Sequence, residues 1–300
     1  MFTDSRLVPF FAVLCAVLWG SAYPAIKLGY EYFMIDAGAA YDKLLFAGYR
    51  FFLAGVILLA VQKFSGRSIM PEKKTDFIKF SLLGLVHTFL QYVLLYLGMT
   101  NTTGVKSSIV GSSSVFMSIV IAHFLYPNDR LNWRKMVGCL SGVLAVLLLN
   151  LDSGFTLQAL KFNWAGDGLI LFSTLMGCLG CIGNKELARE NNVFTITGWQ
   201  LILGSLMLLA VGMLNGGALI FYSFKCHLLL IYMALLSSVA LLVWSALYKY
   251  NKVGKIAVYS FLTPVFGVIL SAVWLGESLH DPKLLVALLI TSWGIYFVNK

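Results

Sequence analysis

One arginine lies inside an otherwise apolar stretch of the sequence. Arg50 is in the run 43–63, whose other charged residues, Lys43 and Lys63, stand at its two ends. A charge at the centre of a bilayer costs about 2.5 to 3.5 kcal/mol on insertion scales, so such a side chain turns toward protein or a water-filled cavity. A guanidinium can grip a carboxylate with two hydrogen bonds. Arg50 could therefore clamp a substrate carboxylate, or it could pack or gate helices by bonding to backbone carbonyls.

A second polar group lies in the run 77–97. Gly84, His87 and Gln91 follow one another at one-turn intervals, so they share one face of a helix, and we expect that face to line a cavity. An imidazole exchanges its proton near neutral pH and could carry protons. A lone histidine can equally be a neutral hydrogen-bond donor, and both interpretations stay open.

Aromatic residues accompany these polar groups. Their faces could stack on a substrate with an apolar or ring-bearing part, although some will belong to the belt of aromatic residues at the membrane interface. Lys27 could gate an outer cavity or simply reach to the interface as an anchor. The candidate substrate-binding residues are Arg50, His87, Gln91, Tyr92, Trp199, Ser237 and Trp244, and the candidate gating residues are Trp19, Tyr23, Lys27, Tyr248, Tyr259 and Pro264.

The elements that position these residues must be membrane-spanning helices. Apolar residues make up 59% of the chain and charged residues 12%, against roughly 25% charged in soluble domains. Backbone polar groups in lipid need internal partners, so each span is a helix. The fold class is all-α integral membrane, with ten spans near the length of about 20 residues that crosses a bilayer. We expect them at 8–28, 43–63, 77–97, 104–126, 135–150, 164–185, 193–214, 227–248, 255–275 and 283–299.

The sequence matches itself at a separation of 150 residues. Asn101-Thr-Thr-Gly104 and Asn251-Lys-Val-Gly254 each precede a long apolar run, and the same offset pairs Arg50 with Gln200 and His87 with Ser237. Such repetition outranks other sequence signals. Residues 1–150 and 151–300 are therefore predicted to be two five-helix repeats. Because five is odd, the second repeat enters the bilayer with the opposite orientation, an arrangement from which many secondary transporters are built.

The charge balance predicts how the chain sits in the membrane. The 22 Lys and Arg outnumber the 13 Asp and Glu, for a net charge of +9. With both termini cytoplasmic, most basic residues fall on the inner side, as the positive-inside rule requires. We therefore attribute the positive charge to the orientation of the chain in a bilayer with anionic lipid, and we expect no nucleic-acid partner. We also expect a monomer.

The sequence contains no motif for nucleotide binding, dinucleotide binding or zinc proteolysis. No P-loop, dinucleotide fingerprint or H-E-x-x-H is present, and Cys178 and Cys181 form a C-x-x-C without further metal ligands nearby. We expect core packing for these cysteines, no metal, no cofactor and no enzymatic activity. No acidic residue lies in the middle of a span, which disfavours a cation/proton antiporter with a buried carboxylate.

Three segments resemble the EamA-type transporters of the drug/metabolite transporter superfamily. They are Trp19-Gly-Ser-Ala-Tyr-Pro-Ala-Ile-Lys27, Tyr49-Arg-Phe-Phe-Leu-Ala54, and Thr263-Pro-Val-Phe266 followed by Leu275-Gly-Glu277. The resemblance covers nearly the whole chain. It implies two inverted five-helix repeats around a central cavity, a bacterial inner-membrane location, and export of amino acids or other small metabolites. The first half departs from the family at Ser114, where proline is frequent, and at Asp129, where Leu-Gly-Glu is usual.

The residues and the resemblance together predict a secondary transporter. It would move a small metabolite across the cytoplasmic membrane by alternating access, in the direction of export. The candidate substrates are amino acids or similar compounds, aromatic ones included. One alternative is an uptake carrier for a vitamin or nucleobase-like ring compound. Another is a lipid-directed translocase or enzyme, which would change lipid chemistry or leaflet distribution.

Overall fold

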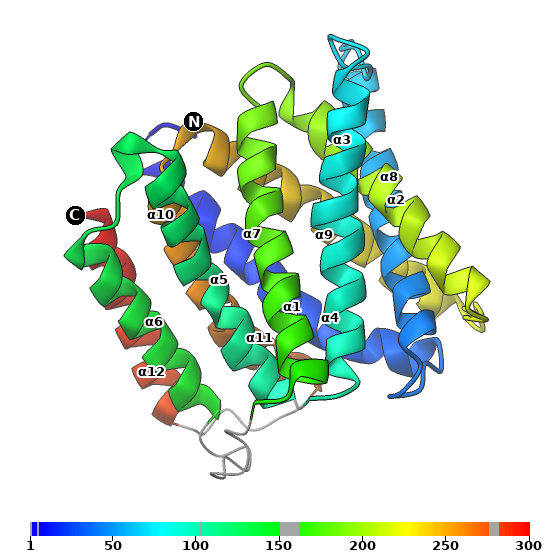
Figure 1. Cartoon of the computed structure of the whole chain (residues 1–300). Helices are drawn as coiled ribbons and strands as arrows, with labels where there is room; N and C mark the ends of the chain where they lie inside the picture. Colours follow the sequence, from blue (N-terminus) through cyan, green and yellow to red (C-terminus); the bar gives the residue numbers. More distant parts are fainter. Residues whose placement is uncertain (1, 5, 103, 151–161, 276–281) are drawn as a thin grey trace.

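The fold is a bundle of helices (Figure 1). The computed structural model describes residues 2–4, 6–102, 104–150, 162–275 and 282–300, and this part of the chain contains no strand. The first-half helices are α1 (Leu7–Tyr32), α2 (Ala40–Phe64), α3 (Asp76–Gly84), η1 (Leu85–Leu90), α4 (Gln91–Met99), α5 (Gly104–Leu125), the short η2 (Pro127–Asp129) and α6 (Trp133–Asn150). The second-half helices are η4 (Trp164–Gly168), α7 (Leu169–Leu187), α8 (Val193–Leu214), α9 (Phe224–Tyr250), α10 (Val253–Ala257), η5 (Val258–Phe261), α11 (Leu262–Leu275) and α12 (Pro282–Asn299).

The helices coincide with the expected spans. Nine helical segments of the described residues are long and apolar enough to cross a membrane, with α3, η1 and α4 forming one of them and α10, η5 and α11 another. The expected tenth span is occupied by α12, a shorter apolar helix, and its crossing stays a prediction. The all-α membrane fold is confirmed. Glu277, part of the third segment that resembles the family, lies outside the described residues.

Three of the described spans are not regular α-helices throughout, and the sixth begins with the π-helical turn η4. The third contains the π-helical turn η1, which carries His87. The ninth passes through the 3-10 turn η5 before α11 begins. Pro264 explains the irregularity of the ninth span, because it has no N–H to donate and its ring excludes the carbonyl four residues earlier.

Helices from the two halves pack in matched pairs. Contacts join α2 to α8, and α6 to α12; α1 packs on α9 and α11, and α7 packs on α4 and α5. If the spans of each half are numbered in order, α1 corresponds to α7, α4 to part of α9, and α5 to α10 and α11. Each of these contacts then has a counterpart with the halves exchanged.

The interface between α2 and α8 repeats this correspondence residue by residue. A β-carbon at Gly48 would lie 2.8 Å from Cγ of Leu209, and one at Gly198 would lie 2.7 Å from Cγ of Leu59. Gly198 and Leu209 lie 150 residues after Gly48 and Leu59. Since numbering rises along α2 as it falls along α8, the two helices run antiparallel. Small residues permit this close approach in a membrane protein.

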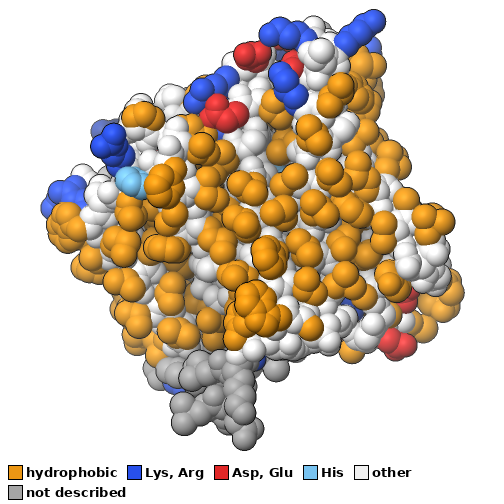
Figure 2. Space-filling view, in the orientation of Figure 1, with side chains coloured by type: hydrophobic (Ala, Val, Ile, Leu, Met, Phe, Trp, Pro, Cys, Tyr) orange, Lys and Arg blue, Asp and Glu red, His pale blue; other side chains and the backbone are white. Residues whose placement is uncertain are grey.

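Apolar side chains cover the flanks of the molecule, whereas Lys and Arg gather at the end drawn uppermost in Figure 2. Side chains as apolar as Phe10, Leu140 and Leu289 are more than half exposed. An apolar surface this extensive marks contact with a partner or a membrane. Here it belongs to the lipid-facing flanks of membrane-spanning helices.

Candidate functional site

Arg50 is buried between the two halves of the bundle. Its side chain is 2% exposed, and its Nε donates to Oγ of Ser237 on α9 at 2.6 Å. The Ser237 hydroxyl in turn donates to the carbonyl of Met233 at 2.7 Å. The serine proton is therefore committed to its own helix, and its oxygen is free to accept from the guanidinium.

Aromatic rings surround the Arg50 guanidinium. Its central carbon lies 5.0 Å from the ring centroid of Phe51 and 5.7 Å from that of Trp19, distances typical of cation–π contacts. The Tyr92 ring packs 4.6 Å from Phe51. Four tyrosines, Tyr30, Tyr92, Tyr96 and Tyr232, also lie near Arg50.

One nitrogen of this guanidinium lacks a partner. Nη2 of Arg50 is buried without a hydrogen bond, and no ion pair to Arg50 occurs among the residues that the structure describes. Leaving a buried donor unsatisfied costs about 1–3 kcal/mol, and more for a charged group. A buried cation with a spare donor is suited to receiving an acceptor from outside the protein.

His87 takes part in the equivalent contact, in which Gln200 of the second half stands at the position of Arg50. Its Nδ1 lies 3.4 Å from the side-chain amide of Gln200 on α8, and its Nε2 lies 3.7 Å from Sγ of Cys181 on α7. Gln200 and Ser237 are the residues that the 150-residue offset pairs with Arg50 and His87. The two halves therefore make corresponding contacts with different chemistry.

Gln91 and His87 both face α7. A β-carbon at Gly177 would lie 3.0 Å from Nε2 of Gln91, while Cys181, one turn further along α7, is the neighbour of His87. Oε1 of Gln91 is buried without a hydrogen-bond partner. The π-helical turn at His87 is of the kind often found at functional sites.

Tyr23 is an exposed ring on α1, one turn from Trp19. The ring of Tyr23 lies against α11, where a β-carbon at Gly267 would be 2.9 Å from its Cδ2. Even so, 53% of its side chain is exposed. Trp19, one turn earlier on α1, is half-buried. These rings leave surface for a ligand to cover.

Other predicted residues lie elsewhere in the bundle. Trp199 donates its Nε1 to the carbonyl of Ile69 at 2.7 Å and packs 4.7 Å from Phe77, so it anchors the loop after α2. Lys27 is exposed near the end of α1. Trp244 packs 5.8 Å from buried Tyr248, and both belong to an apolar cluster that includes Tyr259. Pro264 is half-buried in α11.

Several neighbours of the site, including Phe51, Gln200, Cys181 and Tyr232, were not among the predicted binding residues. Gln200 could have been included from the offset that links it to Arg50. Cys181 and Tyr232 had no such signal, because their neighbours come from distant helices. The hydroxyl of Tyr232 lies 2.7 Å from Oγ of Ser21.

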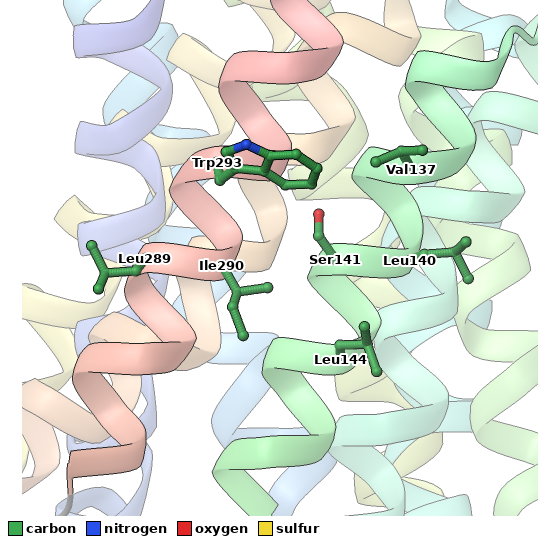
Figure 3. A pocket seen from close by; sticks show the side chains of 7 residues that line it. All are labelled: Val137, Leu140, Ser141, Leu144, Leu289, Ile290 and Trp293. Atoms are coloured by element: carbon green, nitrogen blue, oxygen red, sulfur yellow. The ribbon is translucent and has the colours of Figure 1, made fainter.

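A separate groove lies on the outer surface between α6 and α12 (Figure 3). Its volume is about 490 Å³, and it is lined mainly by Leu140, Leu144, Leu289, Ile290 and Trp293. The hydroxyl of Ser141, which also lines the groove, donates to the carbonyl of Gly138. The groove has no charged lining residue, so it differs in chemistry from the Arg50 site and suits lipid chains.

The apolar helices and the buried polar centre define a multi-pass membrane protein. The model of the EamA-like transporter family matches residues 6–151 and again residues 164–300. The chain belongs to this family and is a membrane transporter, which confirms the resemblance drawn from the sequence.

Similar proteins extend over most of the chain. A probable amino-acid metabolite efflux pump of Salmonella typhimurium is 25% identical over 97% of this chain and 94% of its own. The uncharacterized inner membrane transporter YedA of Escherichia coli is 25% identical over 91% of this chain and 85% of its own. A chloroplastic WAT1-related protein of Arabidopsis thaliana is 26% identical over 94% of this chain, which spans 66% of that longer protein. One crystal structure, 15% identical, has a TM-score of 0.77 with 95% of each chain covered, a likeness of fold.

Proposed function

We propose that the protein is a secondary transporter for a small metabolite that carries a carboxylate, such as an amino acid, and that Arg50 receives this group. The single observation that carries the proposal is that Nη2 of Arg50 is buried and has no hydrogen-bond partner among the residues that the structure describes. Its Nε is held by Ser237 at 2.6 Å, so the guanidinium is oriented before the substrate arrives. A carboxylate would satisfy the spare donor through a charge-assisted hydrogen bond.

The rings beside Arg50 favour a substrate with an apolar or aromatic portion. Trp19 and Phe51 flank the guanidinium, and Tyr92 packs on Phe51. Ring faces of this kind offer large apolar area to a bound ring. Gln91, with a free buried oxygen, would accept from a donor such as an ammonium group on the same substrate.

The mechanism would be alternating access between two inverted repeats, 1–150 and 151–300. The antiparallel packing of α2 on α8 through equivalent glycines supports this arrangement, as do the matched contacts of the two halves. Repeats related in this way rock about a site at their interface. Trp19 and Tyr23 would then gate the site on the side of α1 and α11.

We propose a bacterial inner-membrane location with both termini cytoplasmic, and export as the direction. The clustering of Lys and Arg at one end supports the orientation. Two relatives named as probable amino-acid metabolite efflux pumps support export. Uptake of a ring compound remains the alternative, and the protein is proposed to act as a monomer.

The test is transport by the purified protein in proteoliposomes. A mixed pool of metabolites is offered with and without a pH gradient, uptake is measured by mass spectrometry, and empty liposomes are the control. Transport of carboxylates but not of their amides is expected. Equal transport of acids and amides would contradict the role of Arg50, and altered lipids instead of flux would favour the lipid-directed alternative.

The direction of transport needs intact cells. Expression should lower the intracellular level of the substrate if the protein exports it. A raised level would replace export with uptake, and Arg50→Gln supplies the inactive control for both outcomes.

A further inference from the structure

A polar cleft lies at the end of the bundle, far from the middle of the spans. It has a volume of about 290 Å³ and forms where α5, α7 and α9 end and α10 begins. Its lining includes four basic residues, Lys185, Arg189, Lys249 and Lys252, together with Tyr126 and Tyr250. Nothing in the proposed transport cycle uses these residues.

The acidic groups at this cleft are already engaged within the protein. The carboxylate of Asp129 accepts from Nζ of Lys135 at 2.6 Å and from the backbone N–H of Gly254 at 3.0 Å. The carboxylate of Glu186 accepts from the hydroxyl of Tyr126 at 2.5 Å and pairs with Arg189 at 3.0 Å. Both carboxylates attract Lys185 at longer range, but their direct partners are Lys135, Gly254, Tyr126 and Arg189.

Three lysines of the cleft, Lys185, Lys249 and Lys252, form no direct ion pair with a carboxylate of the described residues. Lys185 donates to the carbonyls of Tyr248 and Asn251, each at 2.5 Å, which positions the ammonium without cancelling its charge. The cleft thus concentrates positive charge from the ends of two helices on one small volume.

The surroundings of the cleft favour a lipid over a free ion. The last residues of α5, Phe124 and Leu125, are 79% and 54% exposed, and Tyr250 on the cleft wall is about half exposed. Apolar side chains beside a basic cleft at the end of membrane-spanning helices suit a molecule with an anionic headgroup and acyl chains. Basic pockets between such helices bind anionic headgroups.

We propose that this cleft binds a phosphate group, that of an anionic phospholipid headgroup. The bound phosphate would join the ends of α7 and α9 with the start of α10, next to the Asp129 contact that already ties η2 to α10. Occupancy would stabilise the bundle at this end. This inference does not depend on the identity of the transported substrate.

The test is thermal unfolding of the full-length protein in neutral detergent micelles. Phosphatidylglycerol, phosphatidylcholine, or phosphatidylcholine with inorganic phosphate is added to each sample. The variant is Lys249→Gln with Lys252→Gln. The control is Lys63→Gln with Lys74→Gln, which removes the same charge from two exposed lysines near the ends of α2 and α3.

Phosphatidylglycerol should raise the Tm of the parent and of the control, and the cleft variant should lose most of that increase. A comparable increase with inorganic phosphate, again lost in the cleft variant, would support the phosphate site with a free ion as its source. No increase, or an equal loss in both variants, would overturn the proposal. If the cleft variant fails to fold, Lys249→Arg with Lys252→Arg should restore the response, and its failure to do so would also overturn the proposal.

Discussion

Arg50 and Ser237 join the two halves of the bundle through a hydrogen bond of 2.6 Å between Nε and Oγ. The residues at the equivalent positions, Gln200 and His87, meet at 3.4 Å. Position for position the contacts correspond, but only one of them carries a permanent charge. The two contacts therefore combine one charged and one neutral polar group.

Replacing Arg50 tests whether its guanidinium binds the substrate carboxylate. Arg50→Gln should reduce transport of a carboxylate about 10- to 100-fold, because a hydrogen bond to a charged group contributes about 1.5–3 kcal/mol and 1.4 kcal/mol is tenfold. Initial rates in proteoliposomes measure this. Ser237→Ala, which removes only the partner of Nε, should reduce transport less. A folded Arg50→Gln protein with unchanged rates would refute the carboxylate role.

Replacing His87 tests whether its imidazole carries protons during transport. The partners of its ring are an amide and a thiol, neither of which would stabilise an imidazolium as a carboxylate does. We therefore expect His87→Gln to retain the response of transport to a pH gradient. Flux at several external pH values measures this. Loss of the gradient response in the variant alone would make His87 a proton carrier.

The glycines between α2 and α8 should matter equally for folding. Gly48→Ala and Gly198→Ala each place a methyl group within 2.8 Å of a leucine on the facing helix, and overpacking of this kind costs typically about 1–3 kcal/mol. Similar decreases in Tm are expected. Gly111→Ala, where a β-carbon meets nothing within 4 Å, is the control. A large difference between the first two would contradict their equivalence.

Trp199 should affect stability more than substrate binding. Trp199→Phe removes the hydrogen bond of 2.7 Å to the carbonyl of Ile69, for an expected loss of about 1 kcal/mol. The KM for the transported substrate should stay near that of the parent. A strong increase in KM with an unchanged Tm would show that Trp199 contributes to substrate binding after all.

The environment of Tyr126 predicts that the protein loses stability at alkaline pH. Burial, and then the hydrogen bond to Glu186, raise the pKa of Tyr126 above its ordinary value. A pKa raised by folding gives stability that is fully present below the ordinary value of about 10 and is lost as the pH rises beyond it. Tyr126→Phe should therefore show a smaller fall in Tm between pH 9 and 11, the two limits being roughly one unit either side of that value. An equal fall in both proteins would exclude this contribution.

The helical nature of the spans was readable from the sequence, and the correspondence of the halves stays a prediction from it. A long apolar run in lipid must satisfy its own backbone groups, so its length alone predicts a helix, and the runs 164–185 and 193–214 begin where Trp164 and Val193 begin their helices. The offset of 150 residues likewise predicted which positions correspond. Arg50 was conspicuous because a charge in such a run needs a partner.

Only the tertiary structure decided what those residues touch. Ser237 lies 187 residues from Arg50, and Trp199, predicted for the cavity, is bonded to a loop carbonyl instead. The spans are apolar on every side, so their hydrophobic pattern does not reveal which face packs. Small residues and specific hydrogen bonds set the rotation of each helix against its neighbours, and these contacts exist only once the helices have assembled.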